Sequence, residues 1–414
     1  MSAERSAPHP GMSFMQFVIM MALLMAIGAM GLDGMLPSLP VIAHDLRIET
    51  PNARQLVVTV YGLSMGVAQI IYGPLMDRYG RKPVLLVGLA GFAVFSVFSA
   101  VATSLPILIL ARCLQGASIA AARVGSVSII RDSYEGRRMA QVMSLCMLVF
   151  MAAPVFAPSI GQAIALVGSW RWFFGVLGIA ASGIALWARV KLPETLHSED
   201  RRKINFGEIT SAFATTMRSR QGMGYTLAGT MIFGALFGFL NSASQVVVDA
   251  LHAPQLFTVI FASVSAFVAV ASLLSARLVQ RFGSRLLSHA ALIASIAVAG
   301  VHVAVSLYGH ESVVSFVILL GCSMFCFGLM AGNFGALAIE PLGHIAGSAA
   351  SAQGFISVVG GSIVGFAIGQ SFDGTVVPLV SGYLGCCMAA LVIIMFTEHG
   401  RLFRSAEVEG QVGA

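Results

Sequence analysis

Charged side chains are scarce in this sequence. Only 10% of its 414 residues are Asp, Glu, Lys or Arg, whereas a typical soluble domain has about 25%. A water-soluble protein of this length could not cover its surface with so few charges, and 57% of the residues are hydrophobic. Many apolar runs reach the ~20 residues that a helix needs to cross a bilayer. The composition therefore excludes a soluble globular protein and predicts a multi-pass membrane protein.

Signatures of several other membrane-protein classes are missing. The sequence has no G-x-x-x-x-G-K-[ST] loop for a nucleotide, no His and Glu constellation for a metal, and no repeated filter-like loop. All six Cys residues lie in apolar runs without the spacing of a metal site, and we interpret them as free, buried thiols. These absences argue against a channel, an enzyme and a metalloprotein, and we expect no cofactor.

Twelve apolar runs are long enough to be spanning helices, and no cleavage site follows the first, so we expect it to remain as a span. A polar stretch, KLPETLHSEDRRKINFGEIT, separates six runs from six. We expect an N-terminal bundle over 1–190, a cytoplasmic linker over 191–222 and a C-terminal bundle over 223–414. The predicted spans are 14–38, 54–76, 83–102, 106–130, 138–166, 170–190, 223–248, 255–280, 286–308, 312–340, 346–370 and 374–397.

The Lys and Arg residues predict the orientation. With the N-terminus inside, only three of the 24 lie in outer loops and two lie within spans. Because positive charge collects on the cytoplasmic side, we expect both termini in the cytoplasm. The net charge of +6 is then a topology signal beside an anionic leaflet, so we expect a lipid bilayer and no nucleic acid as partner.

The loop between the second and third predicted spans is unusually polar. YGPLMDRYGRKPVLL, starting at Tyr72, aligns with SARLVQRFGSRLLSH, starting at Ser275, at the same place in the second half. Arg78 matches Arg281 and Gly80 matches Gly283. Repeated halves with a binding site between them are typical of secondary transporters.

This loop meets every fixed position of G-x-L-x-D-R-x-G-R-[KR], and the chain thereby resembles the major facilitator superfamily over nearly its whole length. The resemblance implies an all-α fold of twelve transmembrane helices in two pseudo-symmetric six-helix bundles. It also implies that the loop is a latch that stabilises the outward-open state. The latch residues would be Gly73, Asp77, Arg78, Gly80, Arg81, Lys82 and Asp132. Gln280 stands where the second copy would need an acid, so a latch there would be weakened.

Three further motifs resemble one branch of the superfamily, the twelve-span drug:proton antiporters for bicyclomycin resistance and chloramphenicol efflux. LARCLQGASIA resembles the motif of span four, and GLDGMLPSLPVI resembles that of span one. APVFAPSIGQAI resembles the antiporter motif of span five, with Pro154, Pro158 and Gly161, although Ala157 and Gln162 replace glycines. The resemblance implies a bacterial inner-membrane protein that acts as a monomer on small molecules and protons.

Charged residues within spans need a reason, because each costs about 2.5–3.5 kcal/mol on insertion scales. Asp33 and Arg112 share a depth, roughly 7–9 Å below the outer boundary at 1.5 Å per residue. Burial favours the neutral carboxyl and a nearby guanidinium favours the ionised one, which is the balance that a proton site needs. The alternative is a fixed ion pair between two helices. Arg123 lies deeper, and either snorkels or lines the inner vestibule.

Polar side chains in other spans suggest a substrate site. Asn241, Gln245 and Asp249 follow one another at helical spacing and predict one polar face, either toward a cavity or toward another helix. Met143, Met147 and Met151 form a similar stripe, which is either ordinary core or a flexible wall of a binding site. The predicted substrate-binding residues are Tyr61, Gln115, Met147, Asn241 and Gln245.

Together these patterns predict a proton-coupled efflux transporter that exports small amphiphilic compounds, such as antibiotics, by alternating access. One alternative is a dedicated exporter of an endogenous metabolite or metallophore. The other is a proton-coupled importer. We interpret Glu340, at the inner end of span ten, as a charge that anchors a loop.

Overall fold

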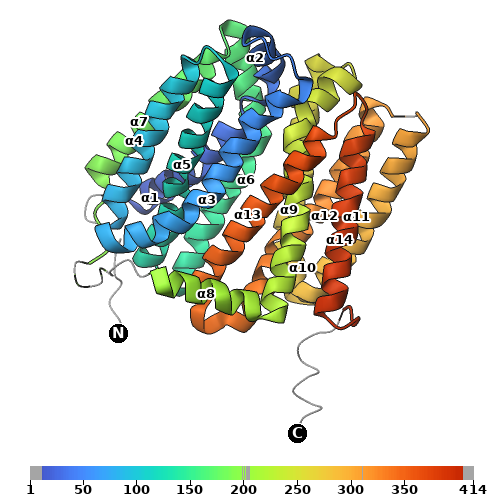
Figure 1. Cartoon of the computed structure of the whole chain (residues 1–414). Coiled ribbons are helices and arrows are strands. Elements are labelled where there is room, and N and C mark those ends of the chain that lie inside the picture. Colours follow the sequence, from blue (N-terminus) through green and yellow to red (C-terminus); the bar gives the residue numbers. More distant parts are fainter. Residues whose placement is uncertain (1–11, 198, 200, 202–205, 310, 404–414) are drawn as a thin grey trace. The chain divides into compact units, whose positions relative to one another are not determined.

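The computed structural model describes residues 12–197, 199, 201, 206–309 and 311–403. These residues form helices and connecting turns without any β-strand. The chain divides into two compact units, residues 1–205 and 206–414 (Figure 1). Twelve helices in the described part are long and apolar enough to cross a membrane. The predicted all-α architecture is therefore confirmed.

The N-terminal unit contains six long helices and one short one. They are α1 (Phe14–Asp33), α2 (Leu39–Asp45), α3 (Leu56–Tyr79), α4 (Arg81–Ala100), α5 (Leu105–Ser133), α6 (Gly136–Val167) and α7 (Arg171–Lys191). Helix α5 packs against α3 and α4, while α1 packs against α6. The first span is longer than predicted, because α1 continues through a 3-10 turn at Leu36–Ser38 into α2, to Asp45. Pro37 and Pro40 explain the break, since proline cannot donate a helical hydrogen bond.

The C-terminal unit has six long helices after a shorter one. They are α8 (Phe206–Arg218), α9 (Arg220–Gln245), α10 (Phe257–Phe282), α11 (Ser284–Leu307), α12 (Val313–Ile339), α13 (Ala346–Gln370) and α14 (Val377–Thr397). Helix α9 packs against α13 and α14, and α12 packs against α10 and α11.

Helix α8 lies within the predicted linker, 191–222, whose residues 198, 200 and 202–205 fall outside the described part. The ring of Phe213 on α8 makes an edge-to-face contact with Phe355 on α13, with 5.8 Å between centroids. The second part of the predicted linker is therefore a helix packed on the C-terminal unit. Its amphipathic spacing is visible in FGEITSAFATTMR, although the polar composition of the whole stretch obscures it.

Small residues allow the helices to approach one another. A methyl group added to Gly116 on α5 would overlap with the carbonyl oxygen of Tyr61 on α3. Large apolar side chains lie on the outside instead, such as Val167 at 85% and Ile179 at 75% exposure. Exposed apolar surface and glycine-mediated contacts are typical of helices packed in lipid.

Candidate functional site

Arg112 on α5 is the centre of a buried cluster in the N-terminal unit. Its guanidinium carbon lies 4.1 Å from the ring centroid of Tyr61, on α3, and 5.6 Å from that of Phe174, on α7. Nη1 donates a hydrogen bond to Oε1 of Gln115 at 2.6 Å, and Nε donates to the Val57 carbonyl at 3.2 Å. Cation–π contact and hydrogen bonds therefore hold the charge. The structure brings together Tyr61, Arg112 and Gln115, for which the sequence predicts different roles.

Asp33, the last residue of α1, is buried near this cluster at 4% exposure. It forms no ion pair with Arg112 among the described residues, so the alternative of a fixed pair does not hold in this conformation. Tyr61 lies close enough to interact electrostatically with both charged groups. Oδ1 of Asp33 and Nη2 of Arg112 are buried, and neither has a hydrogen-bond partner in the described part of the chain. Protonation of this carboxyl would therefore break no salt bridge among the described residues.

Helix α6 passes directly over the end of α1. A methyl group added to Gly161 would overlap with the backbone oxygen of Gly34, the residue after Asp33. Pro154 and Pro158 lie inside α6, about two turns and one turn before Gly161, and each removes a backbone donor. The predicted antiporter-motif residues therefore belong to the helix that touches the end of α1.

The charged loop between α3 and α4 is centred on Arg81. Its guanidinium pairs with Asp77 and, through Nε, with Oδ2 of Asp132 at the end of α5, at 2.9 Å. The side chain of Arg81 is only 5% exposed, compared with 17% for Asp132 and 44% for Asp77. The predicted partners of the loop are therefore in contact, and they tie together α3, α4 and α5.

Two glycines of this loop differ in what they do. Gly80 has a φ of 100°, a conformation that favours glycine and permits the tight turn into α4. Gly73 has open space where a methyl group would point, so no neighbouring atom requires glycine there.

Glu194 completes the cluster, and the sequence analysis missed it. Its carboxylate accepts hydrogen bonds from the backbone N–H of Arg81 at 2.8 Å and of Lys82 at 3.2 Å. It follows α7 in the segment LPET, so its place just after the sixth span is the signal that would have found it. A carboxylate at a helix N-terminus satisfies backbone donors that have no partner within the helix.

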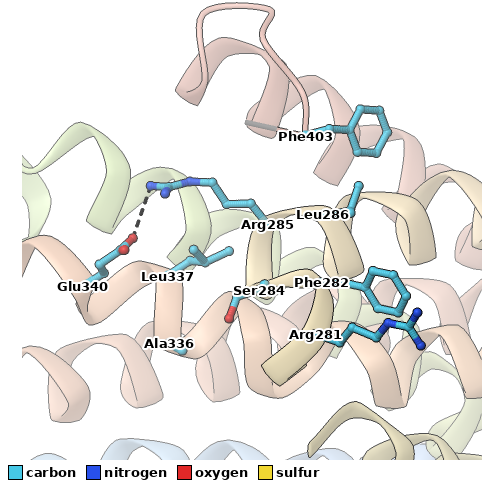
Figure 2. Close-up of a pocket in the computed structure, with 10 residues that line it drawn as sticks. Arg281, Phe282, Ser284, Arg285, Leu286, Ala336, Leu337, Glu340 and Phe403 are labelled. Carbon is cyan, nitrogen blue, oxygen red and sulfur yellow. Dashed lines mark hydrogen bonds and ion pairs between the residues drawn. The ribbon is translucent and has the colours of Figure 1, made fainter. Parts of the chain in front are cut away.

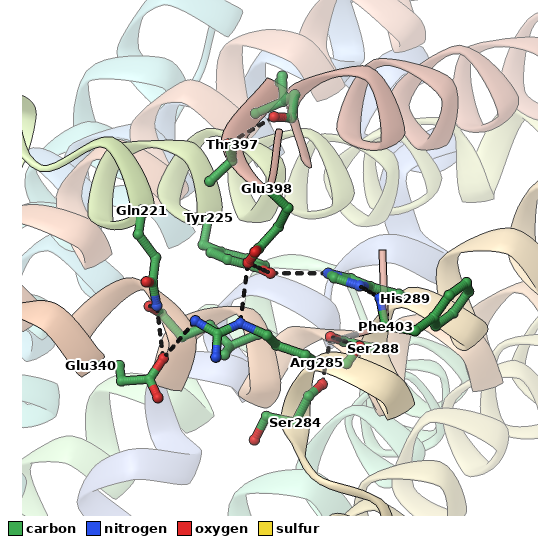
Figure 3. A network of polar contacts seen from close by, with 12 residues as sticks. Gln221, Tyr225, Ser284, Arg285, Ser288, His289, Glu340, Thr397, Glu398 and Phe403 are labelled. Carbon is green, nitrogen blue, oxygen red and sulfur yellow. Dashed lines mark hydrogen bonds and ion pairs between the residues drawn. The ribbon is translucent and has the colours of Figure 1, made fainter. Parts of the chain in front are cut away.

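The C-terminal unit has a charged cluster at the equivalent place (Figure 3). Arg285, near the start of α11, pairs with Glu340 after α12 at 3.2 Å and with Glu398 after α14 at 3.1 Å. In the repeat, Arg285 aligns with Lys82. The expectation of a weakened second latch, based on Gln280, overlooks this cluster because its arginine is displaced by one position. Glu340 does anchor its segment, as predicted.

Buried aromatic groups extend the second cluster. The hydroxyl of Tyr225 on α9 donates to Oε1 of Glu398 at 2.6 Å and lies 2.9 Å from Nε2 of His289 on α11. Nδ1 of His289 accepts a hydrogen bond from the backbone N–H of Phe403 at 3.3 Å. Figure 3 shows these side chains converging from α9, α11 and the segment after α14. No motif in the sequence indicated Tyr225 or His289, because their partners are distant in sequence.

The other predicted site residues are spread along two helices. Asn241 and Gln245 on α9 are buried at 1% exposure, but Asp249 is exposed. The single-face prediction is wrong for Asp249, because residues 246–250 form a π-helical turn that changes the spacing. Met147 on α6 is 39% exposed. Arg123 on α5 is also exposed, without an ion-pair partner among the described residues.

The sequence model of the Major Facilitator Superfamily matches residues 15–365. The chain belongs to the major facilitator superfamily. The resemblance predicted from the loop motif is thus confirmed, and the protein is a multi-pass membrane transporter.

Relatives narrow its place within the major facilitator superfamily. The chain is 30% identical over 375 residues to an uncharacterized MFS-type transporter, YdgK, of Bacillus subtilis, covering 89% of this chain and 92% of that one. It is 27% identical over 399 residues to a protein named bicyclomycin resistance protein homolog in Haemophilus influenzae, covering 94% and 97% of the two chains. These relatives support the drug:proton antiporter branch.

Solved structures confirm the fold. The xylose transporter XylE of E. coli, solved in a partially occluded inward-open conformation, matches with a TM-score of 0.70 at 12% identity. The match covers 94% of this chain and 99% of that chain. At this identity the likeness establishes the major facilitator fold and leaves the substrate open.

Proposed function

We propose that this transporter exports small amphiphilic compounds, including antibiotics, in exchange for protons. The observation that carries the proposal is the carboxyl of Asp33, which is buried at 4% exposure with Oδ1 unpartnered among the described residues. Such a group changes its charge when water or a substrate reaches it, and a buried titratable group in a span is typical of a proton path. Asp33 is the proposed proton carrier.

Arg112 acts on Asp33 from a distance in this proposal. Tyr61 interacts electrostatically with both groups, and Gln115 holds the guanidinium through its 2.6 Å hydrogen bond. The neutral and ionised forms of Asp33 favour different facing states, and substrate competes with the proton by shifting the same equilibrium. The latch around Arg81 stabilises one of these states, since Asp77, Asp132 and Arg81 lie on three different helices.

Proton release tests the coupling step. Substrate is added to the unbuffered, detergent-solubilised protein, and the released protons are measured with a pH indicator. Wild-type protein should release protons on binding, whereas Asp33→Asn should bind an uncharged substrate without release. Release of undiminished size from Asp33→Asn would place the proton site elsewhere, with the exposed Asp249 as the next candidate.

The substrate class is supported by the names of relatives, which include bicyclomycin and multidrug resistance proteins. Met147, Asn241 and Gln245 are the proposed substrate contacts, together with Tyr61 and Gln115 beside Arg112. A growth-inhibition panel in an efflux-deficient host tests this class. Protection against several unrelated antibiotics supports multidrug export, whereas protection against none, with a metabolite accumulating in knockout cells, supports the dedicated exporter.

The proposed setting is the bacterial inner membrane, with a monomeric chain and both termini in the cytoplasm. The excess of Lys and Arg in alternate loops supports the cytoplasmic position of both termini. Reporter fusions after residue 197 and after Thr397 should both report a cytoplasmic position. Uptake that is accelerated by an inward proton gradient would instead favour the importer.

A further inference from the structure

The segment after the last spanning helix takes a strained path along the C-terminal unit. α14 ends at Thr397, and His399, Gly400 and Phe403 then have φ values of 52°, 76° and 72°. This left-handed conformation is unfavourable for residues that carry a side chain, such as His399 and Phe403. A segment with two such residues needs stabilising contacts with its surroundings to keep its path.

Two contacts attach this segment to buried side chains (Figure 3). At its start, Oε1 of Glu398 accepts hydrogen bonds from the Tyr225 hydroxyl at 2.6 Å and from Nε of Arg285 at 3.1 Å. At Phe403, the backbone N–H donates to Nδ1 of His289 at 3.3 Å, and the two rings make an edge-to-face contact with 6.0 Å between centroids. His289 is only 2% exposed. Its imidazole is therefore a buried attachment point for the segment.

The hydrogen bonds determine which nitrogen of His289 carries the proton. Nδ1 accepts from Phe403, so the neutral ring has its proton on Nε2, which lies 2.9 Å from the Tyr225 hydroxyl. That hydroxyl accepts from Nε2 and donates to Glu398, so the hydrogen bonds run in one consistent direction. A second proton can bind only at Nδ1, where it would set one N–H against the N–H of Phe403. The attachment therefore exists only while His289 is neutral.

The charged neighbours of His289 act in opposite senses. The carboxylate of Glu398 favours a positive charge on the ring, whereas the guanidinium of Arg285, on the same helix, opposes it. These two groups are themselves paired, and Arg285 also pairs with Glu340 after α12. Tyr225 on α9 keeps its proton, since it donates to Glu398. The hydrogen bond from Phe403 is therefore the contact that separates neutral from protonated His289 most directly.

The segment also borders a cavity of about 550 Å³ at this end of the unit. Arg285, Glu340 and Phe403 are among the residues that line the cavity (Figure 2). Because the Phe403 side chain is part of this lining, loss of its attachment would remove one part of the wall. Release of the segment would therefore widen the access to Arg285 and Glu340.

We propose that His289 is a pH-sensitive attachment for the segment 398–403, which is released when the pH at this end of the unit falls. Histidine is the side chain whose charge changes between about pH 5 and 8. Under the proposed topology this end faces the cytoplasm, into which a proton-coupled exporter carries protons. The attachment itself requires neither that orientation nor proton coupling.

Amide hydrogen exchange of the full chain in detergent measures the attachment. The exchange rate of the Phe403 amide is compared with its intrinsic rate at each pH between about 8 and 5. The protection factor should fall by about twofold to tenfold as the pH is lowered, which corresponds to the loss of one hydrogen bond. The amide of Tyr383, within α14, should keep its protection and thereby report that the helix remains folded.

Three variants assign the change to His289. His289→Asn keeps an acceptor near the position of Nδ1 but cannot be protonated, so the protection of Phe403 should not depend on pH. His289→Ala should give low protection at every pH. The matched control is His399→Asn, which removes the exposed imidazole of the segment itself and suits the φ of 52°. This control should retain the pH dependence of the wild-type protein.

Protection of Phe403 that does not change with pH in the wild-type protein would overturn the proposal. So would a pH dependence that persists in both His289 variants, or one that disappears in His399→Asn, which would place the sensor on the segment. An equal loss of protection at Tyr383 would show general acid unfolding instead of release. No substrate is present in these measurements, so their outcome is independent of Asp33 as the proposed proton carrier.

Discussion

The two acidic partners of Arg81 should contribute unequally to the proposed latch. Asp132 is 17% exposed and lies 2.9 Å from Nε of a guanidinium that is itself 5% exposed, whereas Asp77 is 44% exposed. A hydrogen bond between charged groups contributes about 1.5–3 kcal/mol when it is shielded from water. Solvent around the more exposed carboxylate of Asp77 screens its pair toward the roughly 0–1 kcal/mol of a surface ion pair. Because each change to Asn keeps the size of the side chain, the difference reports the charge.

If the latch forms in only one facing state, its free energy enters the equilibrium between the states directly. Asp132→Asn should then change the ratio of the states by roughly tenfold to more than a hundredfold, and Asp77→Asn by about fivefold or less. Both changes should shift the protein toward the inward-facing state and slow transport without preventing folding.

The assay is the reaction rate of a single cysteine with an impermeant maleimide added from outside. The cysteine replaces Met147, after the six native cysteines have been removed. Both variants should slow the reaction, Asp132→Asn more than Asp77→Asn. Equal rates in parent and variants would refute the latch, and a larger effect of Asp77→Asn would refute the argument from burial.

Three further predictions follow from single contacts. Gly161→Ala should lower the melting temperature of the purified protein, since overpacking costs about 1–3 kcal/mol. Gly183→Ala on α7, with open space around it, should leave the melting temperature unchanged. Equal melting temperatures of the two variants would contradict the α1–α6 contact. Co-expressed fragments 1–205 and 206–414 should reassemble. If the second fragment starts at Ser219 instead, less assembled protein should be recovered, because this fragment lacks the contact of Phe213 with Phe355. Equal recovery of the two assemblies would show that α8 has no structural role. Burial would raise the pKa of Glu311, but His302, 3.4 Å away, and hydrogen bonds from Ser306 and Ser315 hold that pKa below its usual 4.5. The stability that the ionised carboxylate contributes should therefore be lost as the pH falls below about 4.5. The Glu311→Gln variant should lack this contribution at every pH.

The sequence predicted best those features that depend on local pattern. Apolar runs define the spans, because each helix must satisfy its own backbone in lipid. The motif of the charged loop pointed to Asp132 as a partner of Arg81, and the two are in contact. The π-helical turn after Gln245 escaped prediction, because helical spacing was assumed to continue through it.

Contacts between distant segments were the least predictable. Glu194 and Glu398 follow the last span of each half, yet nothing in their neighbourhoods shows that one caps a helix and the other bonds to side chains. Asp33 and Arg112 share a depth, but the sequence could not show that the ring of Tyr61 accepts the guanidinium and that the carboxyl remains apart. Depth follows from position along a helix, whereas pairing depends on how each helix is rotated.

The overlap that a methyl group on Gly161 would have with Gly34 also has a mechanical consequence. No side chain separates the two backbones, so a displacement of the end of α1 is transmitted to α6 without slack. Pro154 and Pro158 leave α6 with missing hydrogen bonds in the preceding turns, which is where a helix bends most easily. Under the proposed coupling, a movement that begins when Asp33 changes its charge would pass to α6 at this contact, and α6 would bend within the two preceding turns. We therefore expect the contact between Gly34 and Gly161 to act as the pivot of α6 in that proposal.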